Sequence, residues 1–337
     1  MKNPYTVYNY KPGEILNNGH KCVEPEDCCD DIKEGHTYHI LWNHARHYDR
    51  SPPDVLLSNG LLIKKDCHVY YICADIRAGN MGVAFSRSFL KYELVKPQNL
   101  QLIIRSEEKI EKIKKEFPQL KVSFFEEANI DDAELIIVSV KPQDFPFVAK
   151  NLPFKFKEKQ IILSIMAGVK IEKIQDLLNH KNVVRAMPNS PTLIGMGITG
   201  YTAAEGITFN QIIQIERLLN SSGRAVYLED ENLLDAVTAL SGSGPAYFYY
   251  IVDAMIKAGM KMGINENLSK LFVKQTMIGA YHLINNSDKN LDELVKEVAS
   301  KGGTTEAALK VFNENSLKEI VENGIFAAEN RAKELNG

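Results

Sequence analysis

Two hydroxyl side chains, Thr238 and Ser241, stand in a run of small residues whose backbone could approach a ligand closely. The run is DAVTALSGSGPAY, from Asp235 to Tyr247. It begins with helical spacing, breaks at the glycines and restarts at Pro245, which suits the first turn of a new helix. The glycines leave backbone N–H groups open, and the hydroxyls add donors and acceptors. A glycine hinge between two packed helices explains the local pattern equally well.

A second candidate for ligand binding is KGGTT, from Lys301 to Thr305. At the start of a helix, free backbone N–H groups and the helix dipole favour an anion such as a carboxylate. Taken alone, however, this stretch is better explained as an ordinary glycine-rich loop between helices, capped by Thr304 or Thr305.

A third stretch, AGNMG from Ala78 to Gly82, carries part of a dinucleotide fingerprint. It follows HVYYICADI, residues 68–76, which predicts the first strand of a βαβ unit. Gly79 and Gly82 supply the second and third fingerprint glycines, but Arg77 stands where the first should make a tight turn. We therefore hypothesise that the residues before Ala78 are an altered or foreign leader, which sequencing of the coding region would test.

From Asn99 onward, apolar runs that predict strands alternate with amphipathic helices. ELIIVSV and QIILSIM are continuously apolar, as strands buried on both faces of a parallel sheet are. The alternation predicts an α/β fold with a doubly wound, Rossmann-type parallel sheet. It ends with GITGYTA, a helix capped by Gly223, and AVYLE. We expect an appended N-terminal segment over 1–67, a dinucleotide-binding domain over 68–229 and an all-α C-terminal domain over 230–337.

Two strand ends carry candidate cofactor contacts. Arg105 and Ser106 follow the second predicted strand, where a site that prefers NAD would place an acidic residue for the ribose hydroxyls. A basic and hydroxyl pair suits a 2′-phosphate, so NADPH is favoured with NADH as the alternative, and a solvated strand end is the competing interpretation. Lys141 and Pro142 follow ELIIVSV, at the strand ends where ligands bind in such sheets.

The bulk composition narrows the class of protein. The 337 residues suffice for two domains, and 45% hydrophobic with 25% charged residues is ordinary for a globular protein. The net charge of -3 gives no reason to expect nucleic acid or an anionic membrane as a partner. Because no apolar run could span a bilayer and no signal-peptide pattern is present, we expect a cytoplasmic protein. Cysteines and histidines before residue 68 fit no zinc spacing, so no metal site is expected.

Four stretches taken together resemble the pyrroline-5-carboxylate reductase family: AGNMG, VVRAMPNSPT at residues 183–192, SGSGPAY and KGGTT. The resemblance runs from about Ala78 to the C-terminus. It implies NADPH-dependent hydride transfer to the cyclic imine of 1-pyrroline-5-carboxylate, giving L-proline in the last step of proline biosynthesis. It also implies a cofactor site made of Ala78, Gly79, Asn80, Met81, Gly82, Arg105, Ser106, Val140, Lys141, Pro142, Met187, Pro188 and Asn189.

The same resemblance makes Thr238 the catalytic hydroxyl near the imine nitrogen, as an acid or hydrogen-bond partner that assists without being indispensable. It places Gly302, Gly303 and Thr304 around the substrate carboxylate. The full set of implied substrate-binding residues is Asn189, Ser241, Gly302, Gly303, Thr304 and Thr305. Lys301 is a departure, since the family commonly has proline there. No histidine or metal is required, because an iminium is already electrophilic.

The helical domains of this family interlock in homodimers, which often assemble into rings of dimers. The segment at 247–263, YFYYIVDAMIKAGMKMG, is apolar on too many faces for a lone surface helix, although such residues are also common in cores. Two alternatives remain open. One is a related reductase acting on another cyclic imine or a small hydroxy acid, the latter normally needing a catalytic lysine in the helical domain. The other is a non-catalytic protein with a decayed cofactor turn, supported only by Asp75 and Arg77.

Overall fold

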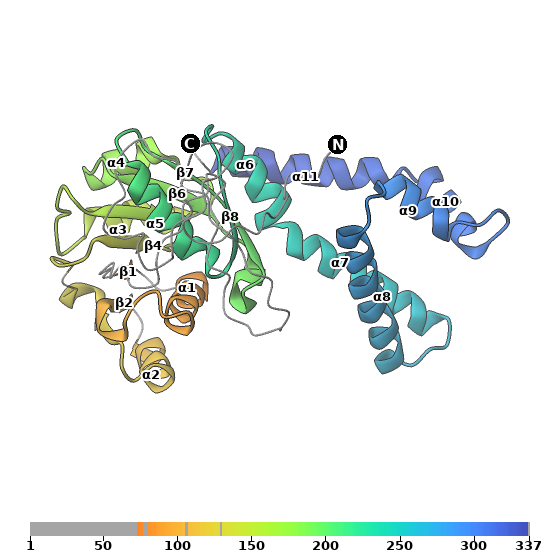
Figure 1. Cartoon of the computed structure of the whole chain (residues 1–337), viewed down its shortest axis with the longest axis horizontal. Helices are drawn as coiled ribbons and strands as arrows, with labels where there is room; N and C mark the ends of the chain where they lie inside the picture. The colour runs from red at the N-terminus through yellow and green to blue at the C-terminus, as the bar shows by residue number, and fades with distance from the viewer. Residues whose placement is uncertain (1–72, 77–79, 105–106, 129, 336–337) are drawn as a thin grey trace, which may run out of the picture.

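The computed structural model describes residues 73–76, 80–104, 107–128 and 130–335 of the chain. An α/β part carries all the strands of these ranges, and helices α7 to α10 project from it as an arm (Figure 1). The expected leader and the predicted turn residues Arg77, Ala78 and Gly79 lie outside the described residues, as do Arg105 and Ser106.

The strands form one eight-stranded sheet in the order β3-β2-β1-β4-β5-β6-β7-β8. β1 to β6 are parallel, β7 runs antiparallel to β6, and β8 pairs in parallel with β7. This confirms the Rossmann-type fold. The sequence pattern did not specify that the last two strands, β7 and β8, run antiparallel to the other six. The strands are β1 (Cys73–Ile76), β2 (Leu100–Ile104), β3 (Lys121–Phe124), β4 (Leu135–Val138), β5 (Ile161–Ser164), β6 (Val183–Met187), β7 (Gly197–Ala203) and β8 (Gly223–Tyr227).

Helices cover both faces of the sheet, as a doubly wound fold requires. One apolar cluster joins α1 (Asn80–Lys91), α2 (Glu107–Glu116) and α5 (Phe209–Asn220) to the sheet. A second cluster joins α3 (Phe145–Lys150) and α4 (Ile171–Leu178) to it. The largest side chains of these two cores are fully buried and include Phe85, Phe89, Phe145, Leu100 and Ile103.

Gly223 does not cap α5, contrary to the sequence-based expectation. Ser221 is the C-cap, and Gly223 begins β8 with a φ of 147°. A Cβ at Gly223 would lie 1.9 Å from the carbonyl oxygen of Gly197, the first residue of β7. The glycine is therefore required by the close approach of the two strand ends and by its backbone conformation.

The chain after β8 is helical in the part that the structure describes. α6 (Leu233–Val237) packs on the sheet, where Gly200 of β7 faces Val237 and Leu234. Helices α7 (Gly244–Lys261), α8 (Glu266–Asn286), α9 (Leu291–Val298) and α10 (Thr304–Glu314) form the arm (Figure 1). The long helix α11 (Leu317–Glu334) runs back along it to the α/β part, where Ala332 is buried and Leu335 abuts Gly168.

The arm exposes many large apolar side chains, and few of its residues are buried. Large apolar side chains exposed in this number on neighbouring helices indicate an interaction site. None of the helices in the described ranges is both long and apolar enough to cross a membrane. The exposed side chains of α7, α8 and α10 include Phe248, Tyr249, Tyr250, Met255, Leu271, Phe272, Tyr281, Leu283, Val311 and Phe312.

Candidate active site

The strand order reverses at β1, whose neighbours are β2 and β4, and such a switch point is where open α/β sheets bind ligands. α1 begins at Asn80, shortly after β1 ends at Ile76, and no acidic residue occupies its first turn. Met81 and Gly82 lie in that turn, with Gly82 buried. The free N–H groups and dipole of this helix start therefore suit an anionic group such as a pyrophosphate.

The end of β4 lies beside the end of β1, because Ile76 pairs with Val138. Val140 is buried, and Lys141 is exposed and leads into the short helical turn η3 (Pro142–Asp144). The structure thus brings two of the predicted cofactor stretches to one edge of the sheet.

The end of β6 supplies the third predicted cofactor stretch and contacts the helical segment after α6. The Nδ2 of Asn189 donates to the Oγ of Ser241 at 3.3 Å, and its Oδ1 accepts from the backbone N–H of Ile198 at 3.0 Å. Pro188 is buried, and the Cε of Met187 lies against Gly242, where a Cβ would stand 2.4 Å from it. Asn189 and Ser241, both predicted to bind substrate, are therefore neighbours.

The glycine-rich stretch interrupts the α-helical path as predicted, and the interruption takes the form of a π-helical turn followed by a bend at Ser243. Thr238 to Gly242 form a single π-helical segment, η5, between α6 and α7, with Pro245 in the first turn of α7 as predicted. Such π-helical insertions into α-helices are frequent at functional sites. The small residues permit the wider turn, which displaces the backbone before α7 begins.

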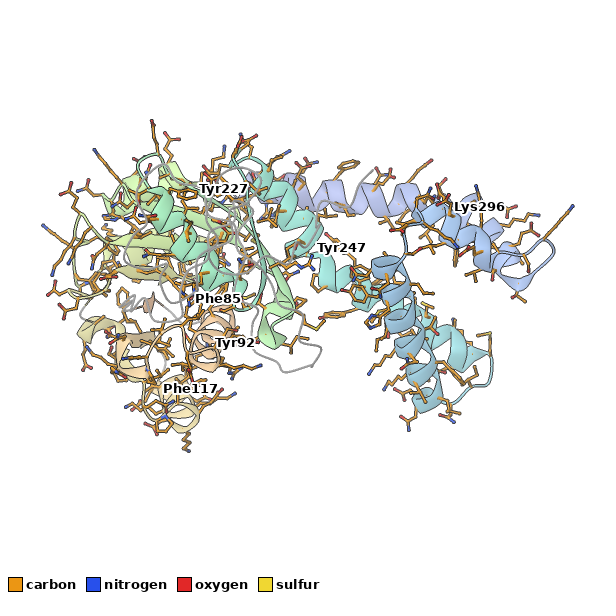
Figure 2. All side chains as sticks on the ribbon, in the orientation of Figure 1. Phe85, Tyr92, Phe117, Tyr227, Tyr247 and Lys296 are labelled. Atoms are coloured by element: carbon orange, nitrogen blue, oxygen red, sulfur yellow. The ribbon has the colours of Figure 1, made fainter. Side chains whose placement is uncertain are left out.

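Thr238 is nearly buried, and its Oγ1 donates to the carbonyl oxygen of Leu234 at 2.7 Å. On the other side of the segment, the hydroxyl of Tyr247 donates to the carbonyl oxygen of Ala239 at 3.0 Å. Figure 2 labels Tyr247 where α7 leaves the α/β part. The first bond joins the π-helical segment to α6, and the second joins it to α7.

A buried ion cluster behind this segment was not predicted from the sequence. Arg185 of β6 is 2% exposed, and its two terminal nitrogens lie 3.0 Å from Glu231 Oε1 and 2.9 Å from Asp235 Oδ1. Asp235 is equally buried. The available signal was an arginine inside the apolar strand VVRAM, because a buried charge requires a partner.

The KGGTT loop lies away from Thr238 within the same chain. It joins α9 to α10 out along the arm, and Lys296 on α9 is well separated from Tyr247 (Figures 1 and 2). The N–H of Gly302 donates to Glu306 Oε2 at 2.7 Å, and the N–H of Gly303 donates to the carbonyl oxygen of Ser300 at 2.9 Å. Thr304 and Thr305 form the first turn of α10, whose N–H groups have no partner within the helix.

One tyrosine of the sheet has a displaced pKa. Tyr201 of β7 pairs with Ala186 of β6, and its hydroxyl donates to Glu216 Oε2 at 3.0 Å. Burial, and then the negative charge of Glu216, raise the pKa of Tyr201 well above its ordinary value. The described residues contain no group of three His, Cys, Asp or Glu side chains able to hold a metal ion.

A parallel sheet with an anion-suited helix start at its switch point is typical of dinucleotide-dependent oxidoreductases. A family model described as NADP oxidoreductase coenzyme F420-dependent matches residues 76–168, and one described as pyrroline-5-carboxylate reductase dimerisation matches residues 231–335.

Named relatives agree with this class. Pyrroline-5-carboxylate reductase 2 of Bacillus subtilis is 33% identical over 77% of this chain and 93% of its own length. Pyrroline-5-carboxylate reductase of Pseudomonas aeruginosa is 39% identical over 61% of this chain and 76% of its own. A crystal structure of Plasmodium falciparum pyrroline carboxylate reductase with NADP bound has a TM-score of 0.72 at 27% identity, covering 79% of this chain and 98% of that one. The chain belongs to the pyrroline-5-carboxylate reductase family.

Proposed function

We propose that this protein reduces 1-pyrroline-5-carboxylate to L-proline, using hydride from NADPH, as the last step of proline biosynthesis. Membership of the family supports the reaction, and the observation that carries it here is the contact between Asn189 and Ser241. This contact joins the strand end proposed to hold the nicotinamide to the π-helical segment that carries the proposed catalytic hydroxyl, Thr238.

The described residues fit a dinucleotide, because the start of α1 lies at the switch point and carries no acidic side chain in its first turn. We assign the pyrophosphate to the amides of Asn80, Met81 and Gly82. The ribose and nicotinamide are assigned to Val140, Lys141 and Pro142 with Met187, Pro188 and Asn189. When bound, the nicotinamide supplies the hydride. Ala78, Gly79, Arg105 and Ser106 complete the proposed cofactor set, and the preference for NADPH over NADH rests on the last two.

Thr238 orients the substrate nitrogen in this proposal. Because its only hydroxyl proton is directed at Leu234, its lone pairs are free to accept the N–H of a protonated imine. Accepting that bond selects the iminium, the form that most readily takes a hydride. Ser241, which accepts from Asn189, would stand at the edge of the same pocket.

The substrate carboxylate is assigned to KGGTT of a second copy, because this loop and Thr238 are separated within one chain. The exposed apolar arm and the dimerisation family model over 231–335 support a homodimer in which the arms interlock, with a ring of dimers as the further prediction. Thr304 and Thr305 would grip the carboxylate by their amides. Gly302 would join them where the carboxylate displaces Glu306, and Gly303 would join them by releasing the carbonyl oxygen of Ser300.

The direct test is NADPH oxidation by the purified full chain with pyrroline-5-carboxylate, compared with NADH and with an Arg77→Gly variant. Proline formation by both proteins supports the proposal and makes the altered cofactor turn a tolerated departure. Activity only in Arg77→Gly would mean that the substrate site is sound and cofactor binding is impaired. If neither protein oxidises NADPH with pyrroline-5-carboxylate although both bind NADPH tightly, another substrate would be favoured. Fractionation of cells tests the predicted cytoplasmic location.

The alternatives are less well supported. The dimerisation family model and the named relatives favour the proline-forming reaction over another imine or hydroxy acid. Weak NADPH binding by the full chain would revive a non-catalytic protein whose cofactor turn has decayed.

A further inference from the structure

Arg185 lies in an unusual position for a side chain with no assigned function. It stands inside β6 among apolar neighbours, is 2% exposed, and binds Asp235, which is also 2% exposed. Burying two charges costs hydration that only good geometry recovers, so such a pair is weak evidence for stability alone. Its placement relative to the proposed active site indicates another role.

Successive side chains on one side of β6 and its extension contact one helical segment. Side chains two apart in a strand point the same way. Arg185 binds Asp235, Met187 lies against Gly242, and Asn189 donates to Ser241. β6 and its extension therefore contact the α6–η5 segment both near the start of that segment, at Asp235, and near its end, at Ser241 and Gly242.

Thr238 lies between these two attachments. It follows Asp235 by three residues and precedes Ser241 by three residues in the same helical path. Its hydroxyl is fixed to Leu234, one residue from Asp235. A shift of Asp235 would consequently move the Thr238 hydroxyl relative to Met187 and Asn189, where the nicotinamide is assigned.

Glu231 extends the cluster to a third element. Its Oε1 accepts from Arg185 at 3.0 Å and from the backbone N–H of Ile171 at 2.8 Å, at the start of α4. Nearby, the Nζ of Lys170 lies 3.2 Å from Asn232 Oδ1. One guanidinium thus fixes β6 to α6 directly and, through Glu231, to the start of α4.

Resting on the proposed function, we infer that Arg185 is a positioning residue, which by binding Asp235 and Glu231 holds Thr238 at a fixed place beside the nicotinamide-binding end of β6. A lysine cannot replace it, since one ammonium group cannot reproduce the two nitrogens of the planar guanidinium.

The test uses Arg185→Lys in the full chain, which retains a buried positive charge. We expect NADPH affinity within about threefold of the wild type, because the cofactor contacts themselves are intact. We expect kcat for pyrroline-5-carboxylate to fall about tenfold or more, as small displacements of reacting groups do. The primary isotope effect on kcat with NADPH deuterated at the transferred position should rise, because hydride transfer becomes more nearly rate-limiting.

A readout independent of activity is amide hydrogen exchange in the NADPH-bound protein. Exchange within 238–243 should be faster by about tenfold in Arg185→Lys, while the amides of β4 and β5 keep wild-type protection. The control is Arg87→Lys, which alters a more exposed arginine–carboxylate pair, with Arg87 Nη2 2.9 Å from Glu116 Oε2, between helices that contribute nothing to the Arg185 cluster. It should leave kcat, the isotope effect and exchange at 238–243 unchanged.

If Arg185→Lys does not fold, Arg185→Met combined with Asp235→Leu replaces the buried pair by apolar groups, which folds often tolerate. A folded variant of either kind with wild-type kcat, isotope effect and exchange at 238–243 overturns the inference. A wild-type protein without activity on pyrroline-5-carboxylate would reject the proposed function instead, and the exchange experiment would then decide the positioning role alone.

Discussion

The hydroxyl of Thr238 donates to the carbonyl oxygen of Leu234, 2.7 Å away and one helical turn earlier. A carbonyl can only accept, so the hydroxyl proton is engaged and only the lone pairs of the hydroxyl oxygen remain for a further bond. This favours an orienting hydrogen bond over donation of a proton by Thr238.

Thr238→Ala should therefore lower kcat by about tenfold, at the weak end of contributions from positioned polar groups. Thr238→Ser keeps the hydroxyl and should stay within about threefold of the wild type. Steady-state kinetics with pyrroline-5-carboxylate at saturating NADPH measure both. Equal losses in the two variants would remove the hydroxyl from the mechanism.

The side-chain nitrogen and oxygen of Asn189 make different hydrogen bonds, and two substitutions distinguish the contributions of these bonds. Asn189→Asp keeps the oxygen that accepts from Ile198 but loses the donor to Ser241. Asn189→Ala loses both and should lower the free energy of unfolding by about 1 kcal/mol more, because the partly buried hydrogen bond to the backbone N–H of Ile198 is also lost. Thermal unfolding midpoints compare the stabilities of the two variants, and kcat should fall in both. Wild-type kcat in Asn189→Asp would detach the Ser241 contact from catalysis.

Gly223 and Gly206 offer a matched pair of glycines with positive φ. Gly223→Ala forces a Cβ against Gly197, whereas a Cβ at Gly206 meets nothing within 4 Å. Gly206→Ala carries only conformational strain, about 1–2 kcal/mol, while Gly223→Ala adds a backbone clash and should cost more than about 3 kcal/mol. Thermal unfolding midpoints give the comparison. Similar midpoints for the two variants would show that the β7–β8 contact adjusts freely.

Tyr250 on α7 is 78% exposed and should lie in the proposed dimer interface. Tyr250→Glu buries a charge there, so we expect a monomer by light scattering at micromolar concentration and loss of most of the activity. Lys114→Glu, on exposed α2 of the α/β part, is the control and should remain a dimer. An active Tyr250→Glu monomer would refute the assignment of KGGTT to a second copy.

Tyr201 predicts a dependence of stability on alkaline pH. Because burial first and Glu216 second raise its pKa in the folded protein, the neutral phenol contributes stability that is fully present below the ordinary tyrosine pKa of about 10. This contribution is lost as the pH rises above that value. The difference in thermal midpoint between the wild type and Tyr201→Phe should accordingly shrink between about pH 9 and about pH 11. A constant difference would contradict the raised pKa.

Much of the α/β part could be predicted because each strand signal is local. KVSF coincides with β3, and the apolar runs around β4 and β5 contain those strands. The π-helical form of Thr238 to Gly242 could not be predicted, since small residues and glycines weaken a helix without showing whether tertiary contacts will restore it. Here the hydrogen bond from Asn189 to Ser241 is such a contact.

The contacts of Arg185 were also beyond the sequence pattern. Glu231 and Asp235 lie far along the chain from it, and nothing in their spacing reveals that β6 and α6 meet. The hydrogen bond from the Gly302 N–H to Glu306 joins residues only four apart in the sequence. It was not predicted, because the glycines and threonines were interpreted as a site for an external anion. The predicted roles of the site residues remain predictions.

The first and the last helix of the C-terminal helical region both pack against the α/β part. α6 packs against Gly200 at its start, and α11 returns at its finish to bury Ala332 beside Gly168. A single backbone cut between α7 and α8, around Gly263, would consequently not release the arm, because each fragment keeps its own anchor. Evolution could likewise lengthen or shorten the arm, and so alter the partner contacts, without disturbing the nucleotide-binding sheet.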